Sequence, residues 1–224
     1  MTRGILIAGN ESALFSASAS EAAKRVEQYA AALIPSPVPL PEGAAAPQGD
    51  GKGIPLSWSP GSPISARTLV LAAESRMGRI DDAVLVCSPP ALYRPAEALA
   101  PREVDSHINV HVKGWFFLVR ELALYFRSRQ AGTLAMVVSE ASAGGGKDAP
   151  ADLLGPPAEA SFRAFAQGLL ASSAAEPFQI RGFSSAEAGS EADFAAWFFK
   201  FIDEGNRKNS GKWYKYNKLR FFRE

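Results

Sequence analysis

The chain has 224 residues, which suits one domain, because single cores seldom grow beyond roughly 250 residues. Hydrophobic residues make up 47% and charged residues 21%, and no apolar run approaches the ~20 residues of a membrane-spanning helix, so we expect no membrane span. The single cysteine, Cys87, excludes an intrachain disulfide and gives no zinc-site spacing, so we expect no metal and a reducing, cytoplasmic location.

The first predicted elements are a strand and a helix. Residues 5–8 are a short apolar run that ends at Gly9, which predicts a strand. A capping-box pattern at Ser18 and Glu21 then precedes apolar residues at helical spacing up to Leu33. This pattern predicts a helix from about residue 18 to residue 33.

An irregular segment follows at residues 35–63. It holds eight of the sixteen prolines and five glycines, which excludes an ordinary helix over most of its length. Prolines alternate along residues 35–41, as in a polyproline segment or in a strand that can pair along one edge only. Within the same segment, residues 54–58 are a candidate strand.

Strands and helices alternate through the rest of the chain. The predicted strands lie at residues 83–87, 134–138, 178–184 and 212–219, and the predicted helices at 63–78, 101–130, 158–175 and 191–205, the last capped by Ser190. This order predicts one α/β domain over 1–224, a Rossmann-type doubly wound, mostly parallel sheet with helices on both faces. In such sheets, ligands bind beyond the carboxyl ends of the strands.

The C-terminal residues 206–224 form a basic and aromatic tail. The last 25 residues carry eight Lys and Arg against three Asp and Glu, and residues 212–218 interleave lysines with aromatic side chains. Single-strand nucleic-acid binders show a similar pattern, but a solvated face or a strand at an oligomer interface explains it too. We therefore expect no nucleic-acid partner.

Three segments stand in the order that one known family shows: Gly78-Arg79-Ile80-Asp81, the run from Val84 to Pro90, and the run from His111 to Phe117. Over nearly its whole length, the chain resembles the short-chain dehydrogenase/reductase family. The resemblance implies a seven-stranded doubly wound sheet, NAD(P) at the first loop, and dimers or tetramers. We expect a homodimer or homotetramer through helices 102–130 and 158–175.

The cofactor loop departs from the family pattern, Gly-x-x-x-Gly-x-Gly. The three glycine positions fall on Gly9, Ala13 and Phe15. A phenyl ring at the third position would lie where the phosphates and the helix need space. The nearest acid for a ribose hydroxyl is Glu42, 33 residues past Gly9 where ~20 is usual. We therefore interpret Gly9 as a turn and Phe15 as a core residue, and only the resemblance suggests NAD(P).

The catalytic positions depart further. Ser139 ends the fifth predicted strand and matches the family serine that polarises the substrate, while His111 falls on the family asparagine that supports a proton relay. We interpret His111 as a partly buried helix residue with a structural hydrogen bond. The family tyrosine and lysine fall on Gly155 and Glu159, and neither can donate the proton or hold the nicotinamide ribose.

These departures predict a degenerate family member that binds a ligand or a partner without transferring hydride. Two alternatives stay open: an NAD(P)-dependent oxidoreductase with an unusual relay through Ser139 and His111, and a structural subunit paired with an active paralogue. A serine hydrolase is disfavoured because no Gly-x-Ser-x-Gly elbow occurs.

Overall fold

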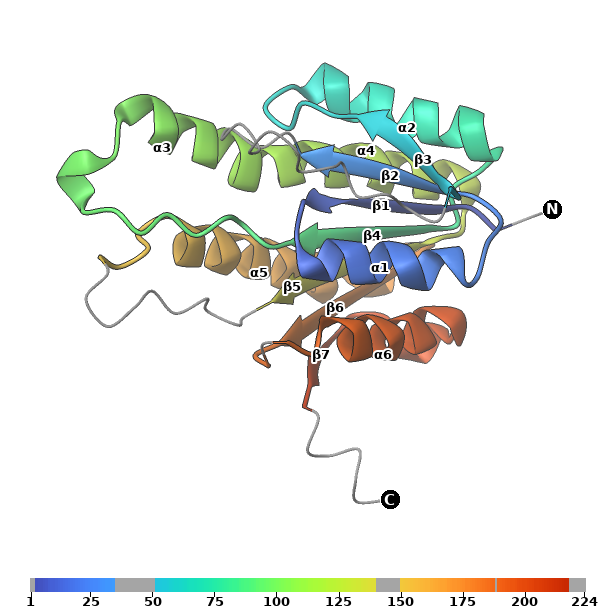
Figure 1. Ribbon diagram of the computed structural model, residues 1–224. Helices are drawn as coiled ribbons and strands as arrows, with labels where there is room; N and C mark the ends of the chain where they lie inside the picture. The colour runs from blue at the N-terminus through green and yellow to red at the C-terminus, as the bar shows by residue number, and fades with distance from the viewer. Residues whose placement is uncertain (1–2, 35–50, 140–149, 188, 218–224) are drawn as a thin grey trace.

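The computed structural model describes residues 3–34, 51–139, 150–187 and 189–217. Its centre is a seven-stranded sheet in the order β3-β2-β1-β4-β5-β6-β7, and all neighbouring strands are parallel (Figure 1). The strands are β1 (Ile5–Asn10), β2 (Tyr29–Ile34), β3 (Gly53–Ser57), β4 (Asp82–Cys87), β5 (Thr133–Ser139), β6 (Gln179–Ser185) and β7 (Lys212–Tyr216).

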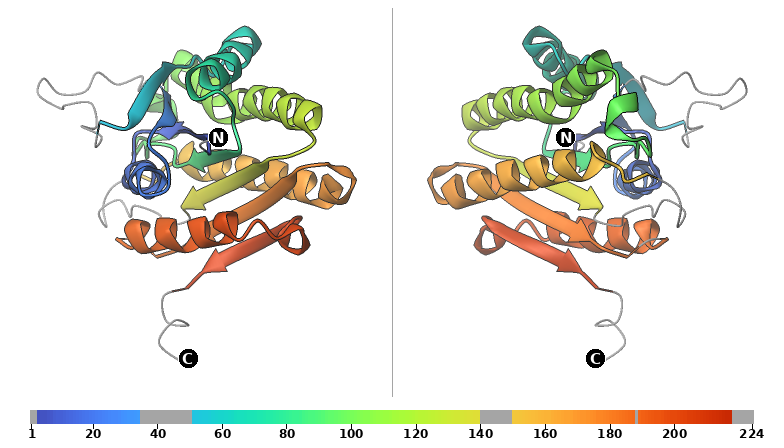
Figure 2. Two further views of the ribbon diagram at one scale, coloured as in Figure 1. Left: turned by 90° about the vertical axis from the view of Figure 1, so that its right-hand side faces the viewer. Right: turned by 90° about the vertical axis from the view of Figure 1, so that its left-hand side faces the viewer.

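Helices cover both faces of the sheet (Figures 1 and 2). One face carries α1 (Ala13–Ala23) and α6 (Glu191–Asp203), and the other carries α2 (Pro63–Met77), α4 (Gly114–Arg129) and α5 (Gly155–Ser172). A further helix, α3 (Pro101–Ile108), continues into α4 through a π-helical turn at Asn109–Lys113, and short 3-10 turns lie at Ala96–Ala98, Ser173–Ala175 and Arg207–Asn209. The predicted Rossmann-type α/β fold is confirmed.

Two apolar layers hold the helices to the sheet, because successive side chains of a strand point to opposite faces. In β4, for example, Leu85 packs in the layer under α2, α4 and α5, whereas Val84 and Val86 pack in the layer under α1 and α6. The central strands are buried on both faces, which explains why β4 and β5 read as continuous apolar runs in the sequence.

The helix predicted for residues 18–33 is wrong. Helix α1 begins at Ala13, and residues Tyr29–Ile34 form strand β2, which pairs with β1 on one side and β3 on the other. A short apolar run is compatible with a helix or with a strand, and here hydrogen bonding along both edges stabilises the strand. Ser18 is not a cap: its hydroxyl donates to the Leu14 carbonyl inside the helix.

Other boundaries differ less. Helix α5 begins at Gly155 and not at 158, with prolines in its first turn, where their missing amide costs nothing. The Ser190 hydroxyl donates to the Glu187 carbonyl and does not accept from the helix that it precedes. The predicted strands at 54–58 and 212–219 are confirmed as β3 and β7, which end at Ser57 and at Tyr216. The alternating prolines at 35–41, and Glu42, lie outside the described residues.

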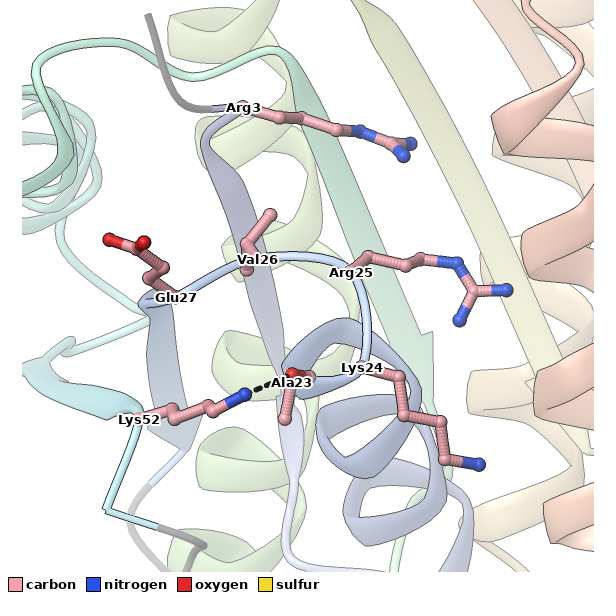
Figure 3. Close-up of a pocket in the computed structure, with 7 residues that line it drawn as sticks. All are labelled: Arg3, Ala23, Lys24, Arg25, Val26, Glu27 and Lys52. Atoms are coloured by element: carbon pink, nitrogen blue, oxygen red, sulfur yellow. Dashed lines mark hydrogen bonds between the residues drawn. The ribbon is translucent and has the colours of Figure 1, made fainter.

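A hollow of about 380 Å³ lies at the amino ends of the strands, lined by Arg3, Ala23, Lys24, Arg25, Val26, Glu27 and Lys52 (Figure 3). Its cations are already engaged. Arg3 pairs with Asp82 and Asp203 at 2.6 Å each, and Lys52 Nζ donates to the Ala23 carbonyl at 2.7 Å. Arg25 also pairs with Asp203, at 2.7 Å. These contacts tie α1 and α6 to the sheet, so the hollow is structural and the opposite edge is the place to look for a site.

Candidate functional site

The carboxyl edge of the sheet brings together the ends of β1, β4 and β5, as predicted. Asn10, Cys87 and Ser139 are the last residues of these three neighbouring strands. The Asn10 side chain is buried, and its Oδ1 has no hydrogen-bond partner in the described part of the chain. Unpaired buried polar atoms are uncommon in folded proteins, so their presence at this edge marks it as a candidate site.

Phe15 fills the space beside the first loop. A methyl group added to Gly9 would lie 3.1 Å from Cδ2 of Phe15 and 2.6 Å from the Val86 carbonyl oxygen. The Phe15 ring is 2% exposed and belongs to the layer under α1 and α6, as predicted. Gly9 itself lies inside β1, so close packing and not a turn requires the glycine.

The start of α1 is capped from within the chain. The Ser12 hydroxyl accepts a hydrogen bond from the Phe15 amide at 3.1 Å, and Ala13 is the first residue of the helix. In a dinucleotide site, amides at this position point at the pyrophosphate. Here one of those amides is satisfied by Ser12, and the ring that follows it is part of the core.

His111 lies in the π-helical turn between α3 and α4 and is 3% exposed. Its ring centroid is 4.4 Å from that of His107, whose Nε2 donates to the Leu154 carbonyl at 3.0 Å. His111 Nδ1 is buried and has no hydrogen-bond partner within the described residues, so the expected structural hydrogen bond is not seen at this atom. Burial, followed by the neighbouring His107, lowers the pKa of His111 to about 3. The ring is therefore neutral at physiological pH.

Gly155 is the first residue of α5, three residues before the predicted start of this helix. Asp152 caps this helix: its Oδ1 accepts from the amides of Leu154 at 3.1 Å and Gly155 at 3.0 Å. A methyl group on Gly155 would lie 2.2 Å from Asp152 Oδ2. Any larger side chain at this position, a tyrosine included, would displace the cap. Asp152 is not among the predicted site residues, although an acid before a proline-started helix is a recognisable capping signal.

Glu159 lies one turn after Gly155 and is half-buried. Burial raises its pKa to about 7, and the charge of Asp152 adds to this effect. Glu159 in turn contributes, after burial, to a pKa of Cys87 well above its ordinary value, which places the carboxyl group near the end of β4. A carboxyl group thus stands on α5 at the predicted lysine position. It would repel a phosphate when ionised and can hold a proton near neutral pH.

Two buried tryptophans pack against each other near this edge: Trp58 follows β3, and Trp115 is the second residue of α4. The rings of Trp58 and Trp115 are 5.5 Å apart, both are at most 2% exposed, and Trp115 also packs edge-on against Phe162 at 5.2 Å. The Trp58 Nε1 atom is buried without a hydrogen-bond partner in the described residues, whereas the Trp115 side chain interacts with the Cys87 thiol at the end of β4. Trp58 is not among the predicted site residues, because no local sequence pattern links it to Trp115.

Ser139 is where the prediction placed it, at the end of β5 and opposite Ser185 of β6. Among the described residues no hydrogen bond joins Ser139 to His111, so the relay between them stays a prediction. No cluster of three or more metal-ligating side chains occurs in the described ranges. No helix among the described residues is long and apolar enough to cross a membrane.

Solved structures share this fold over nearly the whole chain. A short-chain dehydrogenase from Bacillus anthracis superposes with a TM-score of 0.72 at 14% identity, covering 96% of this chain and 95% of that one. A short-chain dehydrogenase from Mycobacterium smegmatis gives 0.69 at 14% (96% and 93%), and an NADH-dependent reductase, A1-R′, solved with NAD, gives 0.71 at 14% (96% and 95%). No protein-family model and no curated protein matches the sequence.

Proposed function

Because the chain has the short-chain dehydrogenase/reductase fold, we propose that it uses this scaffold to bind a ligand or a partner and does not transfer hydride. The observation that carries the proposal is the packing of Phe15 against Gly9. In the family pattern, glycines at the equivalent positions let the backbone approach the pyrophosphate. Here the ring is buried in the core beside Gly9, and Ser12 occupies the amide of Phe15. Both features oppose cofactor binding in the family manner.

The start of α5 supports the same proposal. No tyrosine occurs between Tyr125 and Tyr214, so a shift in the alignment cannot restore the proton donor. The room that a side chain at Gly155 would need is taken by Asp152, and the expected lysine position holds Glu159, an acid. The replacement of the proton donor, the ribose-binding cation and the phosphate turn supports a chain that does not perform the family reaction.

Calorimetric titration of the purified chain with NADH and with NADPH tests the proposal. We expect no saturable heat up to roughly millimolar cofactor, where dinucleotide sites of ordinary affinity (Kd ~1 µM, about −8 kcal/mol) would be full. The NADH-dependent reductase solved with NAD is the positive control under identical conditions. Saturable micromolar binding would contradict the proposal. The alternative oxidoreductase would then be supported if the chain transferred hydride and Ser139→Ala abolished that activity.

We infer that the scaffold self-associates through α4 and α5. Phe116 on α4 is 54% exposed, beside Phe165 on α5 at 5.8 Å, and Ile108 and Val112 just before α4 are 43% and 39% exposed. Large apolar side chains grouped on one face mark interaction surfaces. Light scattering on the purified chain should give at least a dimer, and Phe116→Glu should reduce its mass. A monomer that assembles only with a paralogue would instead support the paired-subunit alternative.

A further inference from the structure

A second apolar surface lies on the far side of α4, between α4 and α2. Three exposed aliphatic side chains line a groove of about 490 Å³ there: Ile64 (77% exposed) and Leu71 (52%) from α2, and Leu124 (49%) from α4. Arg67 and Arg120 also line it. Single exposed leucines are ordinary, but three around one groove leave apolar surface that water covers poorly.

We propose that this groove is an interface between two copies of the chain, in which the α2 helices pack antiparallel across a two-fold axis. Ile64, Arg67, Leu71 and Glu74 follow one another at spacings of three, four and three residues. Residues at this spacing lie along one face of a helix, the arrangement by which two helices pair. The solvent-facing side of α2 therefore carries a stripe of alternating apolar and charged residues.

The charges on this stripe are self-complementary. Arg67 lies about one turn before Leu71 and Glu74 about one turn after it. An antiparallel pairing centred near Leu71 sets this residue against its own copy and brings Arg67 of each chain opposite Glu74 of the other. A two-fold axis repeats every contact, so the interface gains two ion pairs beside one apolar centre.

Arg67 and Glu74 form no ion pair within the described part of the chain, and this favours a second copy over an unrelated partner. Within the described residues neither Arg67 nor Glu74 forms an ion pair, whereas Arg120 at the groove is paired with Glu121 at 2.9 Å. A groove bordered by one sign of charge would fit a partner of the opposite sign. This stripe carries one charge of each sign, at nearly equal distances from its centre, as a two-fold contact requires.

The α2 contact is separate from the α4–α5 contact, because α2 packs on the side of α4 that lines the groove, whereas Phe116 adjoins Phe165 of α5. Two different two-fold contacts on one chain generate a closed tetramer where their axes meet at right angles. The inference does not depend on whether NAD(P) binds.

Sedimentation of the full chain between ~5 and ~100 µM tests the contact. Leu71→Glu should halve the mass of the assembly, because it sets two carboxylates against each other at the axis. Arg67→Glu and Glu74→Arg should each weaken association by about tenfold or more, since like charges then face one another. The double variant Arg67→Glu/Glu74→Arg should restore the wild-type mass. Lys200→Glu makes the same charge change at an exposed position of α6, on the opposite face of the sheet, and should have no effect.

Circular dichroism should show that every variant is folded, because all the altered side chains are exposed or partly exposed. Phe116→Glu separates the two contacts: it should leave an assembly that Leu71→Glu still divides. A wild-type chain that is monomeric at the highest concentration would overturn the proposal, and so would a mass that Leu71→Glu leaves unchanged. Failure of the double variant to recover association lost in the single variants would overturn the Arg67–Glu74 pairing.

Discussion

Replacing Phe15 with alanine is expected to lower the free energy of unfolding by about 3–5 kcal/mol, the usual cost of removing a buried phenyl ring. The ring is 2% exposed in the layer under α1 and α6, and it lies against Gly9. The backbone of Gly9 is held between β2 and β4, so the cavity left by the ring cannot collapse easily. Urea unfolding followed by circular dichroism measures the change.

Phe116→Ala is the matched control, because the same side chain is removed from a site that is 54% exposed. Measured at a concentration where the chain is dissociated, it should cost less than about 1 kcal/mol. A loss below about 1 kcal/mol for Phe15→Ala would show that the ring does not fill the space beside Gly9. The main support for the proposed function would then be gone.

The second large effect is an acid sensitivity that His111 confers. Its pKa is about 3 in the folded chain and about 6.5 when unfolded, so the unfolded chain binds the proton first as pH falls. The stability associated with the neutral ring is complete above pH 6.5 and is lost progressively toward pH 3. Between pH 7 and pH 4 this single group should cost about 3 kcal/mol, because each pKa unit corresponds to about 1.4 kcal/mol.

His111→Gln should remove that loss. We expect the difference in unfolding free energy between variant and wild type to move by about 3 kcal/mol in favour of the variant from pH 7 to pH 4. Glu159, whose raised pKa has the opposite effect over part of this range, is present in both proteins and cancels. Parallel stability profiles for the two proteins would rule out the buried neutral histidine. Histidine proton chemical shifts give the pKa directly.

The sequence predicted most of the fold because the decisive signals are local. Strands β4 and β5 are uninterrupted apolar runs, and α2 begins at a Ser62 cap and ends at Gly78, which adopts a left-handed conformation with φ 79°. Strand β2 was missed because its apolar residues also fit a helical spacing. Only the neighbouring strands β1 and β3, remote in sequence, decide that it is extended.

The candidate site was less accessible to prediction. The burial of Phe15 could be predicted from its position shortly after Gly9, because a phenyl ring at this point of the fold is expected to pack in the core. The neutral state of His111 depends on His107 and on burial by α3, α4 and α5, and the role of Asp152 depends on how the chain turns into α5. Contacts between distant segments set these properties, so no local residue pattern predicts them.

The two margins of the sheet limit how this protein can assemble. An exposed edge strand can recruit a strand from another molecule, which leads to aggregation. Strand β3 has five residues and carries Pro55 at its centre, which removes an amide donor, and β7 carries Lys212 and Lys215, whose charges disfavour a neighbouring strand. Both margins therefore disfavour continuation of the sheet from chain to chain, and with it growth into open fibres. The contacts proposed for the helical faces need no free strand edge.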